Sequence, residues 1–359
     1  MRFLFIRFIF KDGSAKCTGR NKSLGRNDKS TYVEREPIES LCYSAIMRQG
    51  ALIRIKAPRQ MGKTYLMMKV LSYAREQSFH IVVVSFRLAD ADIFSTLDKF
   101  LQWLCAIISD QLNLAEDISP HWKAVFGSNY NCTHYLGKIV LAQLPSPVVI
   151  AFDDVDVLFH QPNIVADFLG LLRAWCERSK HSNPPTDMWH KLRLIVLHST
   201  EVYISLNQHQ SPFNVGLSIE LPEFTPEQII SLARQYGVAW SIEDANQLSA
   251  LVGGKPDLVS LTLEWIADQG GNLETILREV NTPANLYHEH LRQQFRLIQE
   301  YPELVPLLAQ VMSQAEPVKL AAIQAFQLES LGLVQLEGQS VRPSCKLYEQ
   351  YFGSLLESP

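Results

Sequence analysis

One short segment constrains this chain more than any other: a strand, a loop and a helix that follow one another without interruption. Residues 51–56 (ALIRIK) are mostly apolar and predict a buried strand, and residues 66–71 (LMMKVL) predict a helix. The loop between them, residues 57–64, reads APRQMGKT, which matches the pattern G-x-x-x-x-G-K-[ST] except that Ala57 replaces the first glycine. This order of elements predicts a phosphate-binding loop (P-loop) on an α/β fold.

The residue types of the P-loop suit the phosphates of a nucleotide and a Mg²⁺ ion. Gly62 lets the backbone come close to the phosphates, and successive N–H groups at the start of the helix point at them. We expect Lys63 to reach the β- and γ-phosphates and the Thr64 hydroxyl to ligate Mg²⁺. Ala57 precedes a proline and is confined to extended geometry, so the loop turns differently there without losing a phosphate ligand. The predicted nucleotide-binding residues of this segment are Ala57, Arg59, Gln60, Met61, Gly62, Lys63, Thr64 and Tyr65.

An apolar strand that ends in acids supplies a partner for the P-loop. Residues 148–152 (VVIAF) run directly into Asp153 and Asp154, with Asp156 shortly after, which is the Walker B arrangement. Asp153, at the end of the strand, is placed to hold Mg²⁺ through water. Asp154 stands where many such ATPases carry a glutamate that orients the attacking water. Because aspartate is one methylene shorter, we expect slow hydrolysis, and the alternative for Asp154 and Asp156 is that they cap the next helix.

Polar residues also follow another apolar stretch, residues 192–197 (LRLIVL), which predicts the fourth strand. His198, Ser199 and Thr200 come directly after it. A polar side chain at such a strand end can hydrogen-bond the γ-phosphate or the attacking water, and Ser199 or His198 can take that role. We predict Ser199 as a catalytic residue beside Asp154. The alternative, which the sequence leaves open, is a plain turn at the end of a strand.

The pattern over residues 32–222 alternates strands with helices. The four predicted strands, residues 51–56, 81–86, 148–152 and 192–197, are apolar along most of their length. Helical spacing over residues 94–112 and 164–178 lies between successive strands. This predicts an α/β fold of the P-loop NTPase kind: a parallel sheet with helices on both faces. In such sheets ligands bind at the carboxyl ends of the strands, which is where the P-loop and the acids stand.

After Pro222 the pattern becomes helical. Thr225 and Ser241 each begin a capping box, and residues 223–300 predict a helical lid. Residues 301–359 predict two helices and a hairpin, which suggests a winged-helix module.

Composition sets further limits. The chain has 359 residues, is 47% hydrophobic and carries a net charge of −4, so it has no overall attraction to nucleic acid or to an anionic membrane. Its six cysteines are scattered, and we expect reduced thiols in a cytoplasmic protein. No apolar run approaches the roughly 18 residues needed to cross a membrane. Residues 1–31 predict a disordered tail or an incorrectly assigned start.

On these residues the chain resembles the bacterial AAA-like ATPase domains that are common in cyanobacteria, within the STAND class of signalling ATPases. The resemblance covers residues 32–356. It rests on the segments 32–35 (YVER), 59–64 (RQMGKT), 152–156 (FDDVD), 192–202 (LRLIVLHSTEV), 211–216 (SPFNVG), 221–224 (LPEF), 253–256 (GGKP), 343–348 (PSCKLY) and 351–352 (YF).

The resemblance implies ATP, rather than GTP, with Mg²⁺ as the ligands. It implies that residues 32–35 lie near the base of the nucleotide. It also implies that residues 254–256 are the GxP element, through which the lid touches the nucleotide and which makes Pro256 a nucleotide-binding residue. Read from the residues alone, Gly-Gly-Lys-Pro is a helix break.

Three functions remain open. The first, which we favour, is a nucleotide-driven switch in signalling, with protein partners and a nucleotide-dependent homo-oligomer. The second is a DNA-dependent ATPase that uses the winged helix; because its expected recognition helix, residues 318–330, has one Lys and one Glu, we expect no nucleic-acid partner. The third is a scaffold that binds nucleotide without hydrolysis. Arg173, Arg178 and Arg193 are candidates to reach a neighbour's phosphate, with a surface or ion-pair role as the alternative for each.

Overall fold

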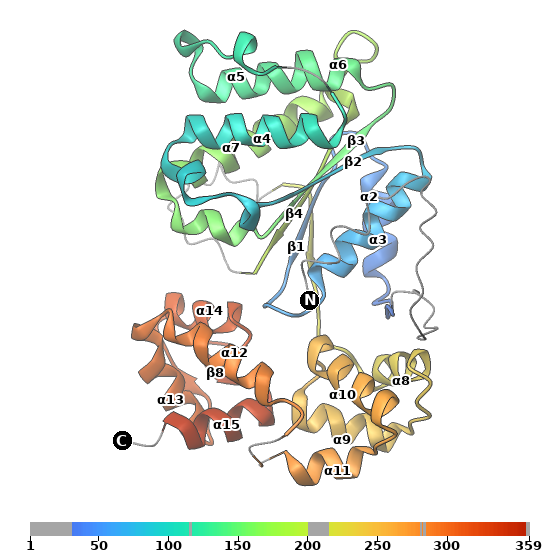
Figure 1. The fold of residues 1–359 in the computed structure, drawn as a ribbon, viewed down its shortest axis with the longest axis vertical. Coiled ribbons are helices and arrows are strands. Elements are labelled where there is room, and N and C mark those ends of the chain that lie inside the picture. The colour runs from blue at the N-terminus through green and yellow to red at the C-terminus, as the bar shows by residue number, and fades with distance from the viewer. Residues whose placement is uncertain (1–30, 115–116, 200–214, 281, 283–284, 357–359) are drawn as a thin grey trace, which may run out of the picture. The chain divides into compact units, whose positions relative to one another are not determined.

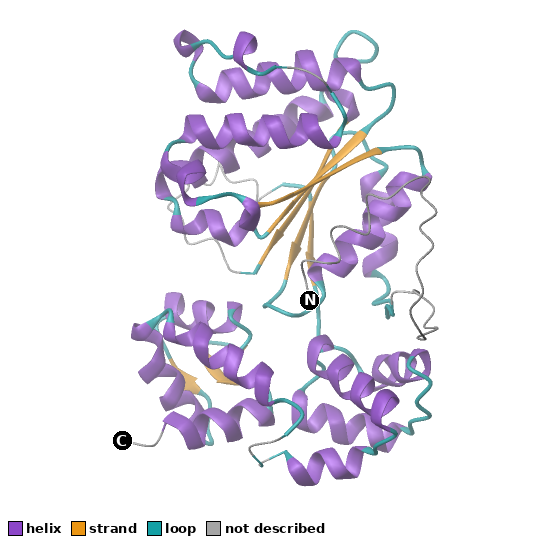
Figure 2. Cartoon of the chain, viewed as in Figure 1, coloured by secondary structure: helices purple, strands orange, loops and turns teal. Residues whose placement is uncertain are grey.

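A five-stranded sheet, parallel throughout, forms the centre of the first part of the chain (Figures 1 and 2). Its strands lie in the order β2 (His80–Ser85), β3 (Val148–Asp153), β4 (Leu192–His198), β1 (Leu52–Lys56) and β5 (Leu217–Glu220). Four of these strands were predicted. The fifth, β5, is short and half exposed, so it lacks the apolar run by which the others were recognised.

This computed structural model describes residues 31–356, apart from 115–116, 200–214, 281 and 283–284. Three parts of the sequence on which expectations were based lie outside the described residues. They are the tail over residues 1–30, the last three residues of the segment 192–202, and residues 211–214 of the SPFNVG segment.

Helices cover both faces of the sheet (Figure 1). On one face lie α2 (Ile38–Ile46) and α3 (Lys63–Glu76), whose buried side chains share a core with Ile53, Ile55, Ala151 and Ile195. The other face carries α4 (Leu97–Gln111), α5 (Ser128–Tyr135), a π-helical turn (Leu136–Val140), α6 (Leu141–Gln143) and α7 (Pro162–Lys180). The predicted doubly covered parallel sheet is confirmed.

A cluster of phenylalanines anchors the second face. Phe168 of α7 meets Phe86, Phe100 and Phe152 edge-on, with ring centroids 5.3–5.4 Å apart. All four side chains are fully buried. The cluster therefore joins α7 and α4 to β3, the strand that carries the Walker B acids.

Helices follow the sheet, as expected. They are α8 (Pro226–Gln235), α9 (Ile242–Val252), α10 (Pro256–Gln269), α11 (Leu273–Glu279) and α12 (His288–Gln299). Both capping boxes are present: Thr225 with Gln228 begins α8, and Ser241 with Asp244 begins α9. The glycine pair at 253–254 separates α9 from α10.

The last part of the chain combines helices with a small antiparallel sheet. Its elements are α13 (Val305–Ser313), β6 (Val318–Lys319), α14 (Ala322–Ser330), β7 (Val334–Glu337), β8 (Ser340–Pro343) and α15 (Lys346–Leu356), with strand order β6-β8-β7. One expectation was wrong: residues 318–319 do not begin a recognition helix. They pair with β8 as strand β6.

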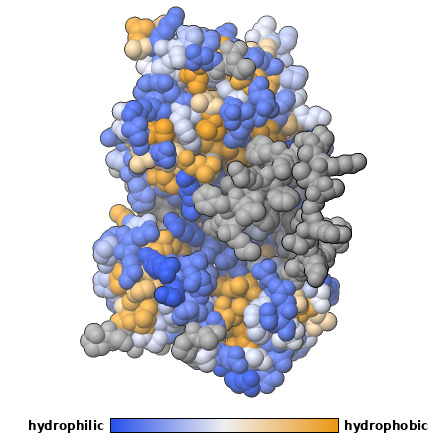
Figure 3. Space-filling view, viewed as in Figure 1, coloured by the Kyte–Doolittle hydropathy of each residue, from blue (hydrophilic) through white to orange (hydrophobic). Residues whose placement is uncertain are grey.

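On the face of the molecule shown in Figure 3, hydrophilic and hydrophobic residues are interspersed. Among the described residues, no helix combines the length and the apolar character needed to span a membrane.

The Phe168 cluster gives a test of the fold. We expect Phe168→Ala to lower the free energy of unfolding by about 3–5 kcal/mol, because it leaves a cavity among three other rings. Chemical denaturation followed by tryptophan fluorescence would measure this. Val125→Ala is the control, because that side chain is 83% exposed and its truncation should change stability by less than about 0.5 kcal/mol. A similar loss in both variants would contradict the cluster's role.

Candidate functional site

The P-loop lies at the carboxyl end of β1, between that strand and the first turn of α3. Two of its residues have positive φ angles, Gln60 (+67°) and Gly62 (+88°), and these turn the chain into the helix. A Cβ on Gly62 would also lie 3.2 Å from a guanidinium nitrogen of Arg35. Both the backbone angle and the close approach of Arg35 therefore favour glycine at position 62.

The Lys63 side chain folds over the P-loop. Its ammonium donates hydrogen bonds to the carbonyl oxygens of Ala57 (2.7 Å) and Pro58 (2.8 Å). Burial lowers the pKa of Lys63 to about 8, against the opposing effect of the nearby Asp156 and Asp153 carboxylates. The lysine is thus a desolvated cation at the start of a helix, where an anion would stabilise its charged form.

Strand order brings the Walker B acids to the P-loop. β4 lies between β1 and β3, with His198 opposite Lys56 of β1 and Val196 opposite Phe152 of β3. The Thr64 hydroxyl donates to Oδ2 of Asp153 over 3.2 Å. Burial and then the neighbouring Asp154 raise the pKa of Asp153. The two predicted metal ligands therefore meet, and a bound cation would favour the charged form of this carboxylate.

Asp154 is held by neighbours that the sequence analysis did not identify. Its Oδ1 lies 2.9 Å from Nε of Arg87, and its Oδ2 accepts a hydrogen bond from the Ser85 hydroxyl (3.2 Å). Its backbone has φ +56°, and its N–H donates to Asp153 Oδ1 (2.9 Å). Ser85 is the polar residue that ends the apolar run of β2, and this was the signal available in the sequence.

Asp156 does not cap the next helix. It lies within the next helical segment, the 3₁₀ helix Val155–His160, whose N-cap residue Asp154 makes no side-chain capping bond. Oδ1 of Asp156 instead accepts the backbone N–H of Ser199 (2.7 Å). His198 and Ser199 are both buried at the end of β4. Asp156 therefore ties the Walker B segment to the end of β4, where the predicted polar residues stand.

Residues 32–35 lie against the P-loop through Arg35, which is 5% exposed. Its guanidinium donates to the Met61 carbonyl (3.0 Å) and stacks 4.6 Å from the centre of the Phe224 ring. Its backbone N–H donates to both carboxylate oxygens of Glu39, each at 2.9 Å. Burial lowers the pKa of Arg35. One side chain thus joins the P-loop to the segment that follows the sheet.

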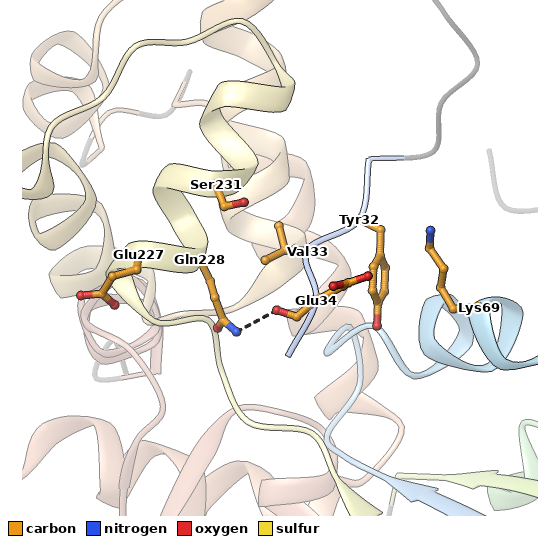
Figure 4. Close-up of a pocket in the computed structure, with 7 residues that line it drawn as sticks. All are labelled: Tyr32, Val33, Glu34, Lys69, Glu227, Gln228 and Ser231. Atoms are coloured by element: carbon orange, nitrogen blue, oxygen red, sulfur yellow. Dashed lines mark hydrogen bonds between the residues drawn. The ribbon is translucent and has the colours of Figure 1, made fainter. Parts of the chain in front are cut away.

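A pocket of about 370 Å³ adjoins this segment. Figure 4 shows its lining, with Lys69 of α3 facing the Tyr32 ring and Gln228 of α8 bonded to the backbone of Glu34. The ammonium of Lys69 lies 5.1 Å from the ring centre. The lining residues are Tyr32, Val33, Glu34, Lys69, Glu227, Gln228 and Ser231.

The remaining predicted site residues are spread around the P-loop. Ala57 and Met61 are buried within the P-loop itself, whereas Tyr65 is 51% exposed on α3. Pro256 is the buried first residue of α10. Next to it, the Gly254 carbonyl accepts the Phe224 N–H (2.7 Å).

The arginine candidates have structural partners. Arg193 is buried at the amino end of β4, away from the P-loop edge, and donates to the carbonyls of His190 (2.6 Å) and Leu192 (2.9 Å). The expectation that it lies on the surface or reaches a neighbour's phosphate was wrong. Arg178 stacks over Trp189 at 4.8 Å. Arg173 lies along α7.

Comparisons with known proteins identify a family and a similar fold. A family model described as "AAA-like domain" matches residues 21–354. No curated protein matches the sequence. Among solved structures, a Walker-type ATPase of Pyrococcus abyssi is similar with a TM-score of 0.58 and 12% identity, over 89% of this chain and 96% of that one. This likeness confirms the P-loop NTPase fold.

Two further structures are more distant. A STAND protein with a tetratricopeptide repeat sensor from Pyrococcus horikoshii has a TM-score of 0.41 and 15% identity, over 90% of this chain and 43% of that one. Cdc6p from Pyrobaculum aerophilum has a TM-score of 0.45 and 13% identity, over 92% and 95%.

The lowered pKa of Lys63 predicts how phosphate binding depends on pH. Anion binding favours the charged ammonium, so affinity for Mg²⁺-ATP should fall as pH rises through about 8, by up to about one unit of log Kd per pH unit. Calorimetry between pH 7 and 9.5 would measure this. Lys63→Arg should bind without that slope, because arginine stays protonated. An equal slope in both proteins would contradict the assignment.

The Arg87–Asp154 pair predicts a restraint on hydrolysis. Arg87→Gln should raise the rate of ATP hydrolysis about two- to fivefold, the factor equivalent to one partly exposed ion pair. The reason is that the Asp154 carboxylate loses a partner that competes with water. A phosphate-release assay would measure the rate, with Arg48→Gln, at an exposed position in the turn after α2, as the control. A lower rate in Arg87→Gln would overturn this interpretation.

Proposed function

The chain belongs to the AAA-like domain family, and from that premise we propose that it is a slowly hydrolysing Mg²⁺-ATP switch of the STAND kind. The observation that carries the proposal is a hydrogen bond from the Arg59 backbone N–H in the P-loop to the Ser330 carbonyl at the end of α14 (3.2 Å). This bond connects the proposed phosphate site to the last part of the chain. A nucleotide that moves the P-loop would therefore either move the end of α14 with it or break this hydrogen bond.

The residues present fit Mg²⁺-ATP. The Thr64 hydroxyl and the Asp153 carboxylate are hard oxygen ligands of the kind that Mg²⁺ accepts. Lys63 supplies a cation for the phosphates. Gly62 has no Cβ, so the backbone at that position is open to the phosphates. When bound, Mg²⁺ would neutralise phosphate charge. The protein's own part is to orient: Lys63 and the P-loop N–H groups position the phosphates, and Asp153 with Thr64 positions the metal.

We assign the base of ATP to the neighbourhood of residues 32–35. Arg35 fixes that segment to the P-loop through the Met61 carbonyl, and the pocket of Figure 4 adjoins it. Pro256, next to the Gly254–Phe224 contact, is the proposed nucleotide contact of the lid.

A second contact supports the switch. The Gln294 amide of α12 donates to the Gln60 side chain over 2.9 Å. Gln60 neighbours Arg59 and has a positive φ, so two successive residues of the P-loop are engaged by later parts of the chain. ADP would be compatible with these contacts, and ATP would open them for a protein partner or a second copy of the chain.

Hydrolysis is proposed to reset the switch slowly. Asp154 and Ser199 would orient the attacking water. Asp154 is short for this purpose, and Arg87 and Ser85 already hold both of its oxygens. A slow rate suits a switch, because the ATP state must last long enough to be read.

The switch predicts a difference between nucleotides. With a non-hydrolysable ATP analogue, limited proteolysis should cut between the sheet and α12–α15 faster than with ADP, and small-angle scattering should show a larger radius of gyration. The reason is the loss of the Arg59–Ser330 and Gln60–Gln294 bonds. Lys63→Ala is the control, because it should show neither binding nor a difference.

Other outcomes identify other functions. Identical scattering and proteolysis with both nucleotides would sink the switch. If nucleotide still bound, and if wild type and Asp154→Ala both hydrolysed at near-zero rates, a nucleotide-binding scaffold would be the better description. A salt-sensitive shift of duplex DNA at micromolar protein would instead favour a DNA-dependent ATPase.

A further inference from the structure

Lys255 is a buried cation between α9 and α10, where it follows Gly254 and precedes Pro256, the first residue of α10. Its residue is 6% exposed. The ammonium donates to the Gly332 carbonyl (3.0 Å), lies 3.9 Å from the Glu223 carboxylate and 5.6 Å from the centre of the Tyr348 ring. A buried ammonium is costly unless it keeps such partners. Lys255 therefore favours arrangements in which Gly332 stays where it is.

Gly332 stands between Lys255 and the P-loop. It follows α14 with φ +78°, and a Cβ on it would lie 3.6 Å from the Arg59 carbonyl oxygen and 3.7 Å from Cβ of Pro58. The same position is 3.9 Å from the Lys255 ammonium. Two residues earlier, the Ser330 carbonyl accepts the Arg59 N–H. Residues 330–332 therefore contact the P-loop, and the hydrogen bond from Lys255 to Gly332 helps to hold this segment in place.

The backbone beside Lys255 leads to the P-loop by a second route. Gly254 packs on Phe224 so closely that a Cβ would lie 2.2 Å from the Phe224 carbonyl oxygen. The Phe224 ring stacks on Arg35, which donates to the Met61 carbonyl. The two routes therefore begin at adjacent residues, 254 and 255, and end on the P-loop within a few residues of each other.

We propose that Lys255 is the latch of the switch: a positioning residue whose ammonium clamps residues 330–332 onto the P-loop in the ADP state. The proposal rests on the function proposed above and goes beyond it. The GxP resemblance gives a role to Pro256, whereas the latch gives one to the residue before it. Opening would require the Lys255–Gly332 bond to break while Lys255 keeps Glu223.

The test compares three variants by the release of N-methylanthraniloyl-ADP and by limited proteolysis in ADP. Lys255→Met keeps the volume and removes the charge. Lys255→Arg keeps the charge and donors. Lys346→Met removes an exposed lysine of α15 as the control. We expect ADP release at least tenfold faster in Lys255→Met, with ATP-like proteolysis, partial recovery in Lys255→Arg and wild-type behaviour in Lys346→Met.

A merely structural lysine would behave differently. Lys255→Met would then lose thermal stability with and without nucleotide alike, while ADP release and the ADP–ATP difference stayed as in wild type, and this result overturns the latch. If Lys255→Met fails to fold, Lys255→Gln carries the test, because it keeps a polar end but removes the charge and shortens the side chain that reaches the Gly332 carbonyl. It should speed ADP release severalfold, and an unchanged rate counts against the latch.

Failure of the latch and failure of the switch give different results. If wild type itself shows no ADP–ATP difference, the switch fails. The latch is then judged by the rate of amide hydrogen exchange at residues 59–62 and 330–333, which Lys255→Met should raise and Lys346→Met should not. If wild type shows the difference and Lys255→Met keeps it, the latch alone fails.

Discussion

The position of β4 between β1 and β3 decides where each side chain of the site lies. Parallel strands bring their carboxyl ends to one edge, and the inserted strand leaves room between the P-loop and the Walker B acids for the end of β4. Asp156 uses that space to bind the Ser199 backbone, while Thr64 still reaches Asp153. The pairing of three strands thus converts two motifs far apart in the sequence into one site.

Sequence patterns predicted the parts of the fold that rest on burial or on capping. β3 and β4 are apolar along their length because helices cover both faces, and Thr225 and Ser241 begin their helices through local hydrogen bonds. β5 and β6 escaped prediction because they are short, and partner strands rather than apolar runs define them. A pattern within one segment carries no information about pairing with another.

The residues of the candidate site also fall into those that the sequence predicted and those that it missed. Lys63, Thr64 and Asp153 follow from motifs whose residue types are dictated by phosphate and metal chemistry. Ser85 and Arg87 escaped because their role depends on Asp154, which the fold brings to them from a neighbouring strand. Arg193 was misjudged for a related reason. A charged residue at the start of a strand is expected to be exposed, yet Arg193 is buried, and carbonyl oxygens at the strand's amino end accept hydrogen bonds from one of its guanidinium nitrogens.

The same reasoning changes the meaning of the Gly-Lys-Pro segment. As sequence it is a helix break, and that explains its glycines and its proline but not a lysine that is buried. A helix break on the surface would leave the ammonium in water at no cost. Here the chain accepts the cost of burying it, and its hydrogen bond goes to Gly332, which packs on the P-loop. Since an apolar residue of the same size would fill this space with less penalty, the lysine is better explained by a contact that must be able to break than by stability alone.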